Sequence, residues 1–118
     1  MRYMLATFTA LALAIAMAGQ AHAHAMLHHA EPRVGGTVSA APHEVTLAFT
    51  QKIEPAFCTV EVTDAAGQRV DDGKPLVDGT VVRVPLKTLA PGTYRVKWRV
   101  MSVDTHATEG AFTFQLKP

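Results

Sequence analysis

The chain has 118 residues, of which 48% are hydrophobic, with 11 basic and 10 acidic side chains and a formal net charge of +1. This length supports one small domain with a single hydrophobic core. The basic residues form no stripe along the sequence, which excludes the electrostatic footprint of a nucleic-acid-binding protein.

The first 23 residues have the three parts of a secretory signal peptide. Arg2 supplies the positive start, residues 4–18 the apolar core, and Ala21-His22-Ala23 an A-x-A cleavage signal. The apolar core is short for a membrane span and no stop-transfer charges follow it. We therefore expect export, with residues 1–23 removed and residues 24–118 left as the mature domain. That domain has 95 residues, ten side chains of each charge and no transmembrane helix of its own.

The position of the cut decides whether a metal-binding amino terminus is formed. Cleavage after Ala23 leaves His24 first, where its free α-amine and its imidazole can bind the same metal ion. Cleavage after Ala25 would instead start the protein at Met26 and remove His24. Cleavage after Ala21 would place His24 third, which is a different amino-terminal copper motif.

The mature sequence is predicted to consist of short strands separated by turns. Residues 24–31 form a first extended segment before Pro32 and a turn at residues 35–36. Regular alternation along this segment places His28 on the same side as His24, and His29 on the opposite side. We interpret His28 and His29 as exposed polar residues near a terminus, with an auxiliary role in metal binding as the alternative. His43, in a turn, is expected to face solvent.

The later strands alternate apolar and polar residues with a period of two, which is typical of half-buried strands. Turns near residues 64–67, 71–75, 78–79 and 90–92 separate them. No stretch after residue 23 has sustained helical periodicity. The pattern predicts an all-β fold, an antiparallel sandwich or barrel. The expected inward-facing residues are Val45, Leu47, Phe49, Cys58, Val60, Val62, Val82, Val84, Leu86, Tyr94, Val96, Trp98, Val100, Phe112, Phe114 and Leu116.

Four features of the later strands have a functional interpretation besides a structural one. Cys58 is the only cysteine, so no intramolecular disulfide can form, and its apolar neighbours favour a core thiol over a copper or redox ligand. Trp98 and Met101 are expected to fill the core rather than shield a metal. The basic residues at positions 95, 97 and 99 are expected to form a solvated strand face, with a docking patch for an acidic partner as the alternative.

Asp104 and His106 are the candidate metal ligands within the folded domain. In an extended segment, residues two apart project to the same side, so these two side chains are predicted to converge. With the amine and imidazole of His24 they would form an N,N,N,O donor set, which suits Cu(II). Asp104 either ligates directly or orients His106 by a hydrogen bond, and both roles stay open. Taken alone, Asp-x-His is more simply a polar turn; its coincidence with an N-terminal histidine favours a metal site.

An ordered set of short motifs runs along the mature chain: His24-Ala25-Met26-Leu27, Pro32, Gly35, Leu47-Ala48-Phe49, Leu89-Ala90-Pro91-Gly92-Thr93-Tyr94, Val96-Lys97-Trp98, Ser102-Val103-Asp104-Thr105-His106, Gly110, Phe112 and Phe114. In this set the chain resembles the CopC family of exported copper-binding proteins. This resemblance implies a small Greek-key β-sandwich of about seven strands, immunoglobulin-like or cupredoxin-like, with Cu(II) held by His24, Asp104 and His106.

Two departures from the family pattern limit the ligands and the copper oxidation state that we expect. Gln51 stands where many members have a glutamate near the copper, so a fourth, carboxylate ligand is not expected. Some members carry a methionine-rich loop for Cu(I), whereas this mature chain has only Met26 and Met101. Because Cu(I) requires soft thioether or thiolate ligands, we expect a Cu(II)-only protein.

The resemblance implies a periplasmic, non-catalytic protein for copper sequestration, trafficking or resistance. Its implied partner is a CopD-type inner-membrane copper protein, and we expect a monomer. A copper-dependent oxidative enzyme with a histidine-brace site is the alternative, although the chain lacks a candidate aromatic platform for a substrate. A metal-free adhesion or assembly module is the third interpretation, and it predicts no stoichiometric Cu(II) uptake.

Overall fold

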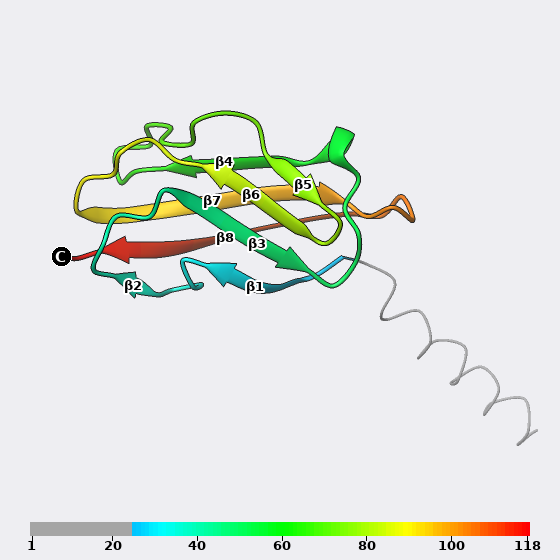
Figure 1. The fold of residues 1–118 in the computed structure, drawn as a ribbon, viewed down its shortest axis with the longest axis horizontal. Helices are drawn as coiled ribbons and strands as arrows, with labels where there is room; N and C mark the ends of the chain where they lie inside the picture. Colours follow the sequence, from blue (N-terminus) through cyan, green and yellow to red (C-terminus); the bar gives the residue numbers. More distant parts are fainter. Residues whose placement is uncertain (1–24) are drawn as a thin grey trace, which may run out of the picture.

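The computed structural model describes residues 25–118, which form two packed β-sheets (Figure 1). The first sheet has the strand order β1-β3-β6-β5 and the second β2-β8-β7-β4. Residues 1–24, which include the predicted signal peptide and His24, lie outside the described range. The strands are β1 (Leu27–Glu31), β2 (Thr37–Val38), β3 (Glu44–Phe49), β4 (Thr59–Thr63), β5 (Leu76–Asp78), β6 (Val81–Pro85), β7 (Gly92–Met101) and β8 (Ala107–Leu116), with a short 3-10 helix η1 (Pro55–Phe57) before β4.

The chain passes repeatedly from one sheet to the other, as Greek-key connections require. Only β5–β6 and β7–β8 are consecutive strands paired within one sheet. The predicted all-β sandwich is therefore confirmed, and the two separate sheets make it a sandwich rather than a barrel. The described residues contain eight strands against the expected seven or so, because β2 and β5 are too short, at two and three residues, for alternation to reveal them.

The core lies between the sheets and contains all but one of the residues that alternation predicted, together with Ala25, Ala30, Ile53 and Leu89, which it did not predict. Burial along β7 follows the period of two, with Tyr94, Val96, Trp98 and Val100 buried and their neighbours exposed. Trp98 packs edge to face against Phe49 of the opposite sheet, with ring centroids 5.1 Å apart. Of the predicted inward-facing residues only Cys58 is half-buried, at the margin of the core, and burial raises the pKa of its thiol to about 11.

Strand β1 departs from the regular alternation that we expected. Its register against β3 shifts between Leu27 and His29, which is a β-bulge. Leu27 packs against the core and Ala30 is buried, so His28 and His29 are both exposed, and His29 contacts Glu31 at 3.1 Å. The expectation that His28 and His29 face opposite sides is therefore wrong, because the bulge adds one residue between two inward positions.

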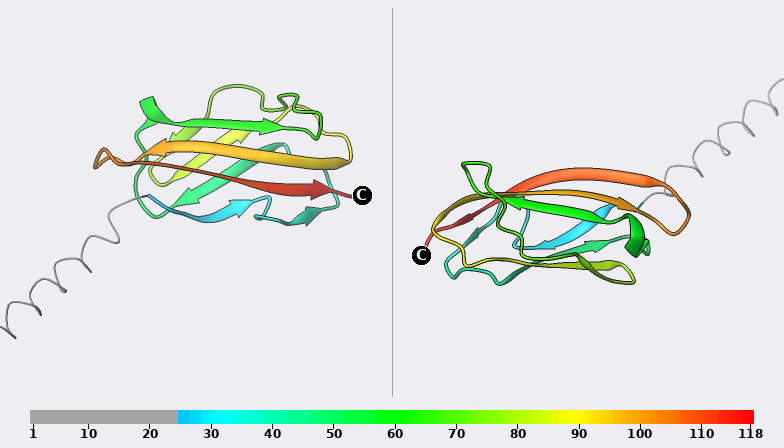
Figure 2. Two further views of the ribbon diagram at one scale, coloured as in Figure 1. Left: turned by 180° about the vertical axis from the view of Figure 1, so that it is seen from behind. Right: turned by 90° about the horizontal axis from the view of Figure 1, so that it is seen from above.

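One end of the sandwich gathers segments that are far apart in the sequence. The start of the described chain and the loop between β7 and β8 lie at this end, and the carboxyl terminus lies at the other (Figures 1 and 2). The segment after β3 joins them, because Val103 N donates to Lys52 O at 3.0 Å and Glu54 N donates to Met101 O at 2.8 Å. Within residues 25–118, no helix has the length and apolarity needed to cross a membrane.

Candidate metal centre

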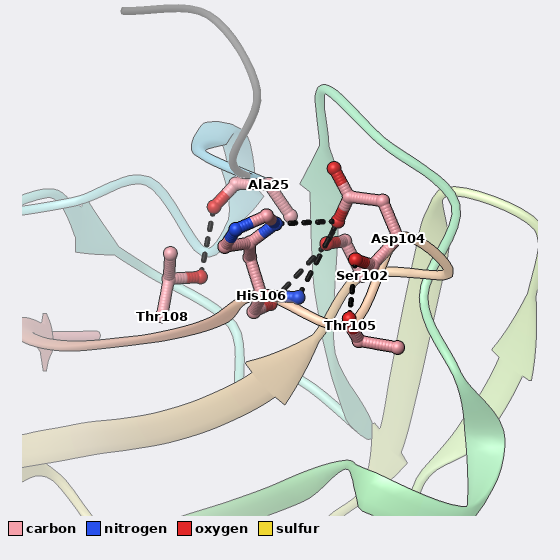
Figure 3. A network of polar contacts seen from close by, with 6 residues as sticks. All are labelled: Ala25, Ser102, Asp104, Thr105, His106 and Thr108. Atoms are coloured by element: carbon pink, nitrogen blue, oxygen red, sulfur yellow. Dashed lines mark hydrogen bonds and ion pairs between the residues drawn. The ribbon is translucent and has the colours of Figure 1, made fainter. Parts of the chain in front are cut away.

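The loop of residues 102–106 joins β7 to β8 and carries the two candidate ligands, Asp104 and His106 (Figure 3). The two side chains do converge, as predicted, but the expectation that they lie on an extended segment is wrong. The loop is a tight turn rather than an extended segment, and Thr105 has a φ of 72°. This left-handed conformation folds the chain back so that His106 returns beside Asp104. Such a conformation is unusual for a β-branched residue.

Backbone hydrogen bonds close this turn. Ser102 N donates to His106 O at 3.0 Å, and Thr105 N donates to Ser102 O at 2.9 Å. The hydroxyl of Thr105 adds a contact to Asp104 O at 2.6 Å. These contacts pair both backbone groups of Ser102 with partners inside the loop.

Asp104 and His106 form a close carboxylate–imidazole pair. His106 Nδ1 lies 3.3 Å from Asp104 Oδ1, and the two side chains are 51% and 44% exposed. The hydroxyl of Ser102, followed by His106, holds the pKa of Asp104 below its usual range, so the group is a carboxylate at neutral pH. Because a carboxylate only accepts hydrogen bonds, the contact favours a proton on Nδ1 and puts the lone pair of the neutral ring on Nε2.

The amino-terminal end of the described chain is anchored beside this pair. Ala25 is fully buried, and its carbonyl accepts a hydrogen bond of 2.8 Å from the hydroxyl of Thr108, which lies two residues after His106 (Figure 3). Met26 exchanges two hydrogen bonds of 2.9 Å with Thr50, one to its hydroxyl and one from its amide. Residues 25–26 are thus held by one threonine from each sheet.

Asp104 and His106 are a two-residue pair and not a complete metal site. Within residues 25–118, no group of three or more His, Cys, Asp or Glu side chains is placed to hold a metal ion. His24, the third predicted ligand, lies outside the described residues. Gln51 is exposed in the segment after β3, Met26 is exposed, and Met101 is half-buried rather than a full core residue.

Three supporting residues of the candidate site were not recognised from the sequence. Ser102 continues the inward period of β7 beyond Val100, and a polar residue at an inward position is a signal that it must have hydrogen-bond partners. No comparable local signal exists for Thr50 and Thr108, because their partners lie 24 and 83 residues away in the sequence.

The chain is similar to a known protein family, to several named relatives and to solved structures. A family model described as "CopC domain" matches residues 27–117. Protein YobA of Escherichia coli K12 is 36% identical over 103 residues, which cover 79% of this chain and 78% of that protein. A copper resistance protein C of Xanthomonas campestris pv. juglandis is 36% identical over 97 residues, covering 75% and 76%. The crystal structure of CopC from Methylosinus trichosporium OB3b superposes with a TM-score of 0.76 at 32% identity, covering 80% and 95%.

Proposed function

The chain belongs to the CopC domain family, and from that premise we propose that it is an exported, non-catalytic protein that binds Cu(II) for sequestration, trafficking or resistance. The proposed ligands are the α-amine and imidazole of His24, the imidazole of His106 and the carboxylate of Asp104. They supply three nitrogens and one oxygen, a donor set suited to Cu(II) in tetragonal geometry. The observation that carries the proposal is the Asp104–His106 pair beside the anchored amino-terminal arm.

The anchoring of Ala25 supports a role for the residue before it. The carbonyl of Ala25 is held by Thr108 of β8, and consecutive Cα atoms are about 3.8 Å apart. A protein that starts at His24 would therefore carry its amine and imidazole close to His106. This argument depends on cleavage of residues 1–23, which is part of the proposal.

Binding rather than catalysis is supported by the distribution of aromatic side chains. Among residues 25–118, Phe57 is the exposed aromatic residue, and the other five are buried in the core. The described surface therefore offers no aromatic platform of the kind that a histidine-brace oxidative enzyme uses to hold its substrate. We expect the copper-loaded protein to show no turnover that depends on oxygen or peroxide.

We further propose that the protein acts in the periplasm as a monomer and exchanges copper with a CopD-type inner-membrane protein. The location, the monomer and the partner rest on the family resemblance alone, while the name of a relative such as the copper resistance protein C of Xanthomonas supports the role in copper resistance. Intact mass of the exported protein, measured with and without Cu(II), would establish the cleavage position and the metal stoichiometry together. A mature chain starting at Met26 would contradict the proposed ligand set.

Substitution of the proposed ligands tests the site directly. We expect His24→Ala and His106→Ala each to weaken Cu(II) binding by more than the roughly 10- to 100-fold loss that is typical of changing a residue that only supports a ligand. Competition with a chelator of known affinity measures the loss. His43→Ala is the matched control, because His43 is exposed just before β3, whose other end lies near the site. Unchanged affinity in both ligand variants would exclude the proposed site.

A further inference from the structure

Ser102 occupies an unusual position in the described part of the chain. It is 1% exposed and is the one polar residue among the buried side chains of residues 25–118. It follows directly after β7 and forms an antiparallel bridge with Ile53, which lies in the segment after β3. The backbone of Ser102 is therefore fixed both by β7 and by the bridge to Ile53.

The hydroxyl of Ser102 is directed at the carboxylate of Asp104. Ser102 Oγ donates to Asp104 Oδ1 and also lies 3.2 Å from His106 O. A hydroxyl has only one proton to donate, and of its two possible acceptors Asp104 is a charged carboxylate, whereas His106 O is a neutral carbonyl oxygen. The hydroxyl proton therefore goes to the carboxylate, where the charge of the acceptor makes the hydrogen bond stronger.

Asp104 Oδ1 is the shared partner of three polar contacts within the loop. It accepts from Ser102 Oγ, lies 3.3 Å from His106 Nδ1 and lies 3.4 Å from His106 N. Both side chains of the pair are about half exposed, whereas Ser102 is buried. The buried hydroxyl of Ser102 is the rigid element in this arrangement.

We propose that Ser102 is a positioning residue of the copper site, whose buried hydroxyl holds the Asp104 carboxylate against His106 and so pre-arranges the pair for Cu(II). This inference rests on the proposed function. Fixing exposed side chains before binding reduces the conformational entropy lost when the metal is bound. Ser102 itself does not touch the metal; it acts through Asp104.

A double-mutant cycle with Asp104 tests this role. Ser102→Ala should lower the Cu(II) affinity of the mature protein by roughly 10- to 100-fold. In an Asp104→Ala background the same change should have little effect, because the group through which it acts is gone. Ser102→Thr, which keeps the hydroxyl, should restore most of the affinity. An equal loss in both backgrounds, or no loss in the first, would overturn the proposal.

A measurement without metal separates this inference from the proposed function. Three-bond NMR couplings of Asp104 in the metal-free protein should report one χ1 rotamer in the wild type and averaging in Ser102→Ala and, if that variant folds poorly, in Ser102→Cys, whose thiol is only a weak donor. Thr113→Ala, an exposed position on β8, is the control and should leave Asp104 unchanged. Averaged couplings in the wild type would contradict the positioning role. Absence of Cu(II) binding by the wild type would contradict only the proposed function.

Discussion

Gly110 of β8 makes room for the only tryptophan of the chain. It pairs across the sheet with Trp98, and a Cβ atom at position 110 would lie 2.6 Å from Cζ2 and 2.9 Å from Cε2 of the indole. The indole in turn packs against Phe49, next to Thr50, which holds Met26. Because Gly110 has no side chain, the indole of Trp98 has room to contact Phe49, and Phe49 directly precedes the threonine that binds Met26.

Gly110→Ala should destabilise the protein by about 1–3 kcal/mol, because the added methyl overlaps a buried ring that has no space to move. Urea unfolding followed by circular dichroism measures the loss, and the emission of Trp98 reports whether the ring is displaced. Ala111→Val is the control, since position 111 is exposed on the same strand and such changes usually stay within about 0.5 kcal/mol. Equal stability of Gly110→Ala and the wild type would contradict the predicted overlap.

The edge strand β4 is protected by the segment that follows it. Val62 N donates to Asp71 Oδ1 at 2.9 Å, Val70 N donates to Val62 O at 2.8 Å, and Thr63 forms a bridge with Arg69. Arg69 binds both carboxylate oxygens of Asp71, at 2.8 and 2.7 Å. These contacts cover backbone groups that an exposed edge would offer to another chain, and the Asp71 carboxylate makes one of them directly.

Asp71→Asn should destabilise the protein by about 1–3 kcal/mol at pH 7, because the side chain of Asp71 is only 8% exposed and the substitution removes the negative charge that pairs with Arg69. The hydrogen bond from Arg69 holds the pKa of Asp71 below its usual range. The contribution of the carboxylate is therefore complete above its unfolded pKa of about 3.9 and is lost as the pH falls through the folded value.

Urea unfolding at a series of pH values tests this sign. The difference in unfolding free energy between the wild type and Asp71→Asn should be largest near neutral pH and should shrink below about pH 4. Asp72→Asn, at the exposed neighbouring position, should differ little from the wild type throughout. A difference that grows in acid would contradict the assignment.

At the scale of the whole molecule, the two sheets are joined where the candidate site lies. The segment after β3 bonds to the ends of β7 and of the 102–106 loop, while Thr50 and Thr108 hold residues 25–26 from opposite sheets. Within residues 25–118, the core cluster extends from Ala25 to Leu116, and Asp104 and His106 are not part of it. Folding and metal binding should therefore respond differently to changes at the amino terminus.

Adding Gly-Ser before His24 should leave the unfolding free energy unchanged and weaken Cu(II) binding, because the α-nitrogen becomes an amide. The same reasoning predicts that Cu(II) affinity of the unextended protein falls as the pH drops below roughly 7.7–8.0, the usual pKa range of an α-amine. Chelator competition on both proteins measures the effect. Equal affinity of the two proteins would show that the amine is not a ligand.

The candidate site was only partly predictable from the sequence. Asp104 and His106 were identified by residue type and by their place after a clear strand, and the structure brings them together. Their geometry was not predictable, because the left-handed backbone of Thr105 is stabilised by contacts within the finished turn. His24 and the cleavage of residues 1–23 stay predictions, since both lie outside the described residues.

The sequence by itself determined the all-β fold, the faces of the main strands and the family. These follow from local rules, because side chains alternate along a strand whatever it pairs with. Only the tertiary structure decided the strand order, the bulge that turns His28 and His29 outward, and the partners of Thr50 and Thr108. These features depend on contacts between segments up to 83 residues apart, and no local period encodes such contacts.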